Sequence, residues 1–259
     1  MTMTNFGKLF KVFNRSKFSA VNQLMLIELA AIAVSLIWTL VSGHMSQMNF
    51  LGAVSGWSGL VYIVGFVLIA RQAEMAFTRD TYRLIPAKNV TFYVANLVSS
   101  LVMFLYLILL QVGLHLIGLA VAWRKIRSEL GGLTMSHPLD ISAGDITQIG
   151  LTVTLLVLTV FVLALTTVTL IHLTISATNN FLPVAGKRVV DAILYIVVIL
   201  LVMRVGVFLF AQLNQVMTTL NVQGLTNMVI PLIGMLVVAA LESLISVFLM
   251  KRWVETVAN

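Results

Sequence analysis

The sequence predicts an all-α, polytopic membrane protein whose chain crosses the bilayer six times. Of its 259 residues, 60% are hydrophobic and only 10% are charged, whereas a soluble domain carries about 25% charged residues. The charges are also clustered. The stretches without any Lys, Arg, Asp or Glu are 29–70, 89–123, 146–186, 192–203 and 205–241. Because one crossing of the hydrocarbon core takes about 20 apolar residues, these stretches exclude a water-soluble globule and predict a single transmembrane domain over residues 1–259.

Hydropathy places the six transmembrane helices at roughly 23–42, 52–71, 89–122, 147–173, 189–213 and 228–250. The third is about 50 Å long at the helical rise of 1.5 Å per residue, which exceeds a straight crossing of the roughly 30 Å core. We therefore expect this helix to tilt, to kink near Gly113 or Gly118, or to project from the bilayer.

The basic residues orient these helices. Twelve of the 16 Lys and Arg residues flank one side: four in the N-terminal segment, four after the second helix, two after the fourth and two in the tail. Only Arg124, Lys125 and Arg127 flank the other side. Because cytoplasmic loops carry the excess of basic residues, we expect both termini in the cytoplasm, and a multi-pass protein of a bacterial plasma membrane.

The N-terminal segment, residues 1–22, has the pattern of an amphipathic helix. On a helical wheel, its apolar residues fall within an arc of about 100°, and these are Phe6, Leu9, Phe10 and Phe13. The basic residues that we expect at the membrane surface are Lys8, Lys11, Arg15 and Lys17. This pattern is typical of an elbow helix on anionic lipid. The alternative is a plain basic leader that only sets topology.

The cytoplasmic connection between the second and third helices, residues 71–88, mixes charges with aromatic residues. Pro86 disfavours helix at Ile85, so one short helix is expected to end there before the next span begins. A short amphipathic helix at a membrane mouth suits docking into a groove of a soluble partner. The alternative is a solvated connector whose arginines only obey the charge rule.

This connection resembles the ABC-2 type permease family, the membrane subunits of ATP-binding-cassette exporters. The matching residues are Glu74, the Leu84-Ile85-Pro86 step and Lys88, and the run from Asp80 to Pro86 followed by Tyr93 and 96–100 is similar to small Gram-positive permeases. The resemblance implies a coupling helix over residues 72–85 that sits on a separate ATPase subunit, and a dimer of permeases. The residues expected to contact this partner are Glu74, Phe77, Arg79, Asp80, Tyr82 and Arg83.

The chain has no ATP-binding motif of its own. A phosphate-binding loop needs G-x-x-x-x-G-K-[ST], and the two Gly-Lys pairs, Gly7-Lys8 and Gly186-Lys187, are followed by Leu9 and Arg188 instead. No bound cofactor is expected, and ATP hydrolysis is assigned to the partner. The string Gly56-Trp57-Ser58-Gly59 fits an intramembrane serine protease, but a Ser nucleophile needs a base within about 2.6–3.2 Å. Small residues that allow close helix packing explain this string and Gly52 better.

A few polar residues lie deep in the predicted helices. Arg204 and Glu242 are the deepest ionisable ones. They either line a polar cavity or gate, or they are satisfied by Asn, Gln or backbone groups or snorkel toward an interface. Gln111 and His115 share a face of the third helix, where an interhelical hydrogen bond is favoured over a pathway lining. Glu28 is expected to meet water or Lys17. The threonines of the fourth helix are expected to bond to their own backbone.

The sequence thus predicts a permease subunit that exports a substrate by alternating access, powered by a cytoplasmic ABC ATPase. The expected partners are this ATPase, a second copy or a homologous permease, and membrane lipid, but not nucleic acid, because the cations form no single patch. The main alternative is a non-transporting membrane protein, such as an immunity factor or an assembly anchor. Composition does not identify the substrate.

Overall fold

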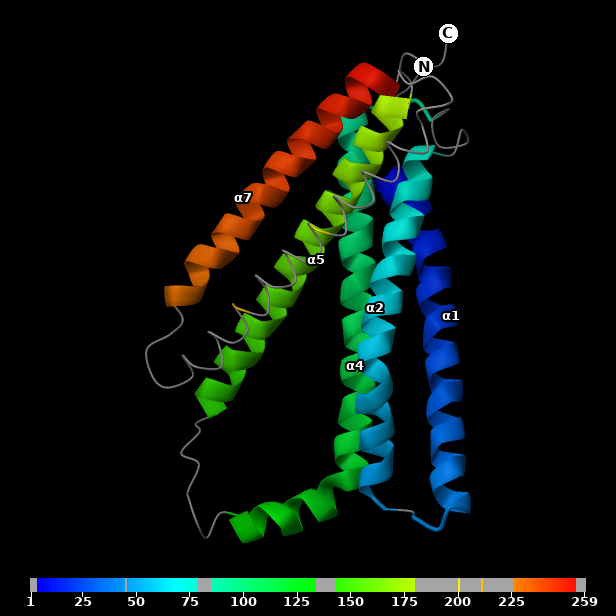
Figure 1. The fold of residues 1–259 in the computed structure, drawn as a ribbon, viewed down its shortest axis with the longest axis vertical. Helices are drawn as coiled ribbons and strands as arrows, with labels where there is room; N and C mark the ends of the chain where they lie inside the picture. The colour runs from blue at the N-terminus through cyan, green and yellow to red at the C-terminus, as the bar shows by residue number, and fades with distance from the viewer. Residues whose placement is uncertain are drawn as a thin grey trace. The chain divides into compact units, whose positions relative to one another are not determined.

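The computed structural model describes residues 4–44, 46–78, 85–133, 143–179, 200, 211 and 226–254 (Figure 1). Within these residues, all regular structure is helical. The elements are α1 (Phe6–Val41), α2 (Met48–Thr78), α4 (Asn89–Leu133), α5 (Ala143–Asn179), α7 (Thr226–Leu249) and the short π-helical segment η1 (Met250–Val254).

Five of the described helices are long and apolar enough to cross a membrane. Their outward surfaces are apolar as well: Leu26, Trp38 and Val41 of α1 are 66%, 73% and 77% exposed. A soluble protein would rarely present so many large apolar side chains to water, whereas hydrocarbon solvates them. The predicted multi-pass membrane class is confirmed at this level. The predicted helix over 189–213 lies outside the described residues, so six crossings stay a prediction.

Helices α1, α2, α4 and α5 are all longer than the hydropathy pattern predicted. The expected elbow and the first span are one continuous helix, α1, because no Pro or Gly interrupts residues 8–41. The third span begins at Asn89 as predicted but continues to Leu133, and Figure 1 shows α4 turning away from its first direction near its C-terminal end. The expectation that this helix would not cross as one straight rod is therefore confirmed.

The chain forms two compact units, Met1–Pro86 with Ala95–Ile146, and Ala87–Val94 with Thr147–Asn259. In the first unit, α1 and α4 run parallel, because their contacts rise together along both helices: Lys17 with Asn96, Asn22 with Tyr106, and Glu28 with Gln111. Helix α2 runs antiparallel to α1. Its late residue Gln72 bonds Ser16, and its early residue Trp57 bonds Ser35.

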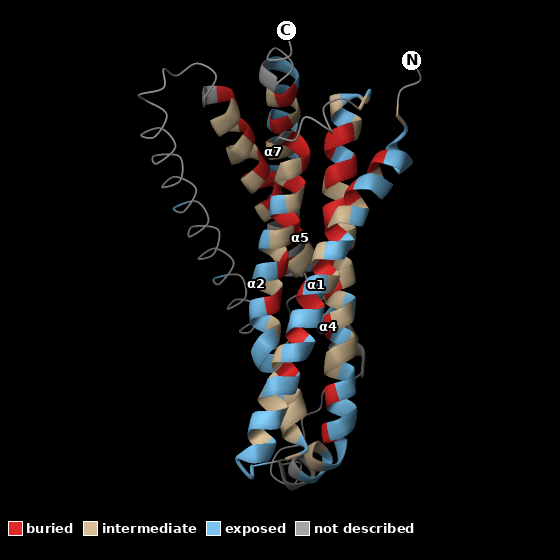
Figure 2. Ribbon diagram, turned by 90° about the vertical axis from the view of Figure 1, so that its right-hand side faces the viewer, coloured by how far each residue is buried: buried red, intermediate tan, exposed pale blue. Residues whose placement is uncertain are grey.

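A single face of α1 is buried in this unit. Buried and exposed residues alternate along α1 with the helical period (Figure 2), which is the pattern of a helix with one packed face. The buried residues are Leu9, Phe13, Lys17, Val21, Leu24, Met25, Glu28 and Ile32. Two of these eight are ionisable, so the buried face carries charge as well as apolar bulk.

Glycine lets the helices approach at two places. A Cβ on Gly65 of α2 would lie 2.5 Å from Cδ2 of Leu107, and one on Gly118 of α4 would lie 3.0 Å from Cδ1 of Leu51. At Gly52 and Gly56, where close packing is expected, a Cβ would have no described atom within 4 Å. Among the described residues, the close approaches therefore lie at Gly65 and Gly118 instead.

The turn between α1 and α2 is closed by a left-handed residue. Gly43 has φ of 72°, and its N–H donates to the carbonyl of Leu40 at 3.2 Å. Glycine adopts this conformation without the steric cost of a side chain, so it is well suited to the residue after a helix. The side chain of Asn49 donates to the carbonyl of His44 at 2.8 Å and fixes the start of α2.

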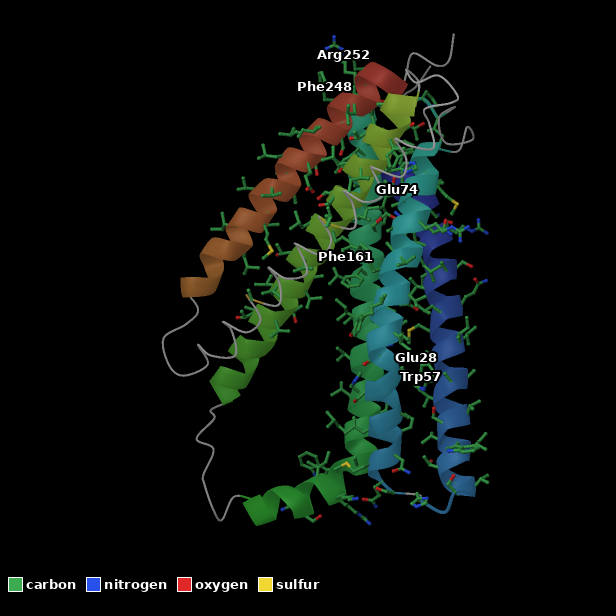
Figure 3. All side chains as sticks on the ribbon, viewed as in Figure 1. Glu28, Trp57, Glu74, Phe161, Phe248 and Arg252 are labelled. Atoms are coloured by element: carbon green, nitrogen blue, oxygen red, sulfur yellow. The ribbon has the colours of Figure 1, made fainter. Side chains whose placement is uncertain are left out.

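In the second unit, α5 and α7 pack through a small apolar cluster. Leu163 of α5 meets Met235 and Ala239 of α7, and all three are buried. The first turn of α4 also contributes, because the hydroxyl of Tyr93 donates to Oγ of Ser243 at 3.3 Å. At the end of α7, the guanidinium of Arg252 lies 5.8 Å from the ring centroid of Phe248 (Figure 3).

Candidate functional site

The most extensive polar contact in the first unit surrounds Lys17, and we call Lys17, Asn96, Ser99 and the carbonyl of Ala73 the lysine cluster. The ammonium of Lys17 donates to Oδ1 of Asn96 at 2.7 Å, to the carbonyl of Asn96 at 3.0 Å and to Oγ of Ser99 at 3.2 Å. All three side chains are at least 98% buried. An ammonium has three donors, so the hydrogen-bonding capacity of Lys17 is fully used.

The lysine cluster joins three helices. Nδ2 of Asn96 donates to the carbonyl of Ala73 on α2 at 2.9 Å, and Ser16 of α1 donates to Oε1 of Gln72 at 2.8 Å. Glu74, the next residue of α2 (Figure 3), interacts electrostatically with Lys17. A buried cation is tolerated only when it is paired and hydrogen-bonded, and these groups supply both conditions.

The cluster lies between the two ends of the 71–88 connection. Ala73 precedes the connection's undescribed part, and Asn96 lies in the second turn of α4 after it. The chain's N-terminus is tied to the same place, because the N–H of Thr4 donates to the carbonyl of Pro86 at 2.9 Å. Both ends of residues 79–84 are therefore anchored to α1 and its N-terminal extension.

The expected role of Lys17 at the membrane surface is wrong. Its side chain is 1% exposed, because Lys17 follows Leu9 and Phe13 at intervals of four residues and so shares their buried face. This spacing is the feature of the sequence from which the burial of Lys17 could have been predicted. Lys8, Lys11 and Arg15 are exposed on the other faces of the helix, where the sequence placed them; their contact with lipid stays a prediction.

Two of the expected partner-contact residues are described. Glu74 and Phe77 lie in the last turns of α2, where Phe77 is buried and Glu74 partly so. Residues 72–78 thus continue α2 without a break. The other four expected contacts, and the rest of a separate coupling helix over 72–85, lie outside the described residues: Arg79, Asp80, Tyr82 and Arg83. Helix α4 begins after Pro86, as predicted.

A second buried polar contact joins α1 to α4 further along both helices, and we call it the Glu28–Gln111 pair. Nε2 of Gln111 donates to Oε2 of Glu28 at 2.6 Å; the two side chains are 0% and 2% exposed, respectively. The interhelical hydrogen bond expected of Gln111 is confirmed. The expectation that Glu28 meets water or Lys17 is wrong, because the packing of α1 on α4 encloses it.

His115 lies one turn beyond Gln111. Its Nδ1 is 2.8 Å from the carbonyl oxygen of Gln111, and since a carbonyl only accepts, Nδ1 carries the proton. His115 is therefore bonded to its own helix rather than across to another, and it fixes the backbone beside the Glu28–Gln111 pair.

In the second unit, Thr166 and Thr167 of α5 bond Glu242 of α7, whose carboxylate is partly buried. Thr166 donates to Oε2 of Glu242 at 2.6 Å, and Thr167 is 2.9 Å from both carboxylate oxygens. Among the described residues, the groups that bond Glu242 are threonine hydroxyls rather than the expected Asn, Gln or backbone groups; a role in a polar cavity or gate stays a prediction. Thr154 and Thr159 bond to backbone carbonyls four residues earlier, as expected. Arg204 lies outside the described residues.

The structure gives no support to a serine nucleophile. Within the part of the chain that is described, the hydroxyl of Ser58 donates to the carbonyl of Ser55 at 3.0 Å, which is an ordinary bond along a helix. No described histidine is hydrogen-bonded to it. The base that this chemistry requires is thus not seen at Ser58 among the described residues, and His137 lies outside them.

Comparison of the chain with protein-family models, with curated proteins and with solved structures finds no match. Function is therefore inferred from the chain's own residues. These residues offer three packed helices that are long and apolar enough to cross a membrane, a connection anchored at both ends, buried charges in the first unit and a partly buried one in the second.

Proposed function

We propose that this chain is the membrane-spanning permease subunit of an ATP-driven exporter of the ABC-2 type. The chain carries long apolar helices, no phosphate-binding loop, and a connection whose residues resemble that family's coupling segment. ATP binding and hydrolysis would take place on a separate subunit docked against residues 79–84, and a second permease copy or homologous permease would complete the transport route between the two.

The lysine cluster is the observation that carries this proposal. A partner that pushes on residues 79–84 would transmit force to the end of α2 at Ala73 and to the start of α4 at Asn96, because these two residues are hydrogen-bonded. Lys17 bonds Asn96 directly, so the same load would reach α1. Three helices would then move together, which is the rigid-body shift that alternating access requires.

Co-purification tests the proposal directly. The tagged full-length chain, solubilised gently from the membranes of its own host, is expected to bring down a polypeptide with a Walker A motif. The complex, reconstituted in lipid vesicles, is expected to hydrolyse ATP. Neutralising the connection with Arg79→Gln and Arg83→Gln together is expected to abolish this association, while the matched pair Lys8→Gln and Lys11→Gln on exposed positions of α1 leaves it intact.

A well-folded chain that brings down no ATPase under these conditions would overturn the proposal and favour the immunity or assembly-anchor alternative. So would an ATPase that is retained equally by both double variants, because its docking would then not involve the connection.

A further inference from the structure

The Glu28–Gln111 pair has more acceptors than donors. Among the described residues, no donor reaches Oε1 of Glu28 or Oε1 of Gln111, although both atoms are buried. The amide protons of Gln111 are directed to Oε2 of Glu28 at 2.6 Å and to Sδ of Met25 at 3.8 Å. The donors are thus exhausted while two oxygens lack a partner.

Exchanging the amide nitrogen and oxygen of Gln111 does not remove the excess. In the exchanged orientation, an amide oxygen would lie 2.6 Å from Oε2 of Glu28. Two oxygens at that distance require a hydrogen between them. In either orientation, the pair therefore lacks one hydrogen or cation to share between its oxygens.

The charge of the surroundings points the same way. Glu28 contributes one negative charge inside a candidate membrane span, where an uncompensated carboxylate costs several kcal/mol. Among the described residues, Tyr62 of α2 interacts electrostatically with Glu28, and His115 of α4, whose Nδ1 is already bonded, lies one turn beyond Gln111. Neither is a fixed cation. The described residues also contain no group of three His, Cys, Asp or Glu side chains suited to a multivalent metal.

We propose that the Glu28–Gln111 pair is a binding site for one small monovalent cation, a proton or a sodium ion, held between the glutamate carboxylate and the amide oxygen. A bound proton would let Glu28 donate to the oxygen of Gln111 while the amide donates back, so that every polar atom of the pair is satisfied. A sodium ion would use the same two oxygens as ligands. The site lies between α1 and α4 and does not depend on an ATPase partner, so the exporter proposal and this one fail independently.

Carbodiimide labelling tests the site on the purified full-length chain in lipid. Dicyclohexylcarbodiimide reacts with a protonated carboxyl in apolar surroundings, and peptide mass spectrometry identifies the modified residue. We expect Glu28 to be labelled, with a rate that falls about tenfold per pH unit at the alkaline end, because one proton is lost. The peptide containing Glu242, measured in the same samples, reports whether the reagent reaches the apolar phase.

Adding sodium chloride distinguishes a site that binds sodium ions from a site that binds only protons. If sodium chloride slows the labelling of Glu28 at fixed pH and choline chloride does not, the site takes sodium as well as protons. If labelling depends on pH alone, the ligand is the proton. Glu28 that stays unlabelled while Glu242 reacts, or that reacts independently of both pH and sodium, would overturn the proposal.

The variant Gln111→Leu tests whether the amide oxygen of Gln111 binds the cation together with the carboxylate of Glu28. The bound state loses two hydrogen bonds and the empty state loses one, so the affinity is expected to fall about tenfold, the worth of one hydrogen bond. The pH profile would then move toward lower pH, or the protection by sodium would weaken. A pH profile that moves toward higher pH would mean that Gln111 only stabilises the charged carboxylate, and would overturn the shared site. Glu28→Gln should lose the label entirely, which confirms the assignment.

Discussion

Lys17 and Asn96 are joined twice across the α1–α4 interface, since one ammonium bonds both the side-chain oxygen and the carbonyl of the same asparagine, at 2.7 and 3.0 Å. Asn96 in turn bonds α2 through the carbonyl of Ala73. Asn96 thus accepts hydrogen bonds from α1 and donates one to α2. The fit of three helices depends on a few atoms whose removal should be measurable.

Replacing Lys17 with methionine should destabilise the protein. Methionine keeps the length of the side chain but leaves Asn96 and Ser99 without their donor, and an unsatisfied buried polar group costs about 1–3 kcal/mol. Thermal unfolding in detergent, followed by intrinsic fluorescence, should show a lower midpoint. Lys11→Met is the matched control, because Lys11 is exposed on the same helix; equal midpoints for the two variants would contradict the burial of Lys17.

Removing the charge of Glu74 should weaken coupling between ATP hydrolysis and transport if the exporter proposal holds. Glu74→Gln keeps the shape of the side chain but removes its electrostatic interaction with Lys17, at the point where the connection leaves α2. We expect ATPase activity of the reconstituted complex to persist while transport per ATP falls. Lys88→Gln, at an exposed position on the other end of the connection, controls for charge loss alone. Unchanged transport per ATP in the Glu74 variant would rule out a coupling role for this carboxylate.

The two threonines that hold Glu242 should each contribute to the stability of the second unit. In Thr166→Val with Thr167→Val, the carboxylate keeps its position but loses its hydroxyl donors. We expect a loss of about 1 kcal/mol for each hydroxyl, because Glu242 is only partly buried. Thr154→Val, at an exposed threonine bonded only to its own helix, should unfold close to the wild type. A double variant as stable as this control would show that the contact contributes nothing.

Gly65 and Gly56 offer a matched test of helix packing on α2. Alanine at either position gains the same helix propensity over glycine, about 1 kcal/mol. At Gly56 the new Cβ meets open space, whereas at Gly65 it would lie 2.5 Å from Cδ2 of the buried Leu107, and overpacking typically costs about 1–3 kcal/mol. Gly65→Ala should therefore unfold at a lower temperature than Gly56→Ala. The reverse order would mean that α2 and α4 are not in close contact there.

The sequence was sufficient for the class of fold and for the places where most helices cross. The third span begins at Asn89, as predicted, and the predicted start at 228 lies within two residues of Thr226. The helix ends were less accurate, because hydropathy marks the part of a helix that lies in hydrocarbon. Backbone hydrogen bonding continues past it, as in the stretch of α4 that ends at Leu133.

The buried polar contacts were harder to predict, for two reasons. Lys17 was assigned to the surface from its charge, although its spacing from Leu9 and Phe13 placed it on the buried face. The partners of Glu28 and Glu242 lie 83 and 76 residues away in the chain. Such pairings depend on which helices are neighbours and at what depth, and neither follows from the composition of a single span.

The parallel arrangement of α1 and α4 limits how this part of the protein can move. Polar partners meet at three successive levels, through Lys17, Asn22 and Glu28. A slip of one helical turn, about 5.4 Å, would break all three levels at once. Sliding is therefore blocked, and the two helices are left to swing as one stiff lever.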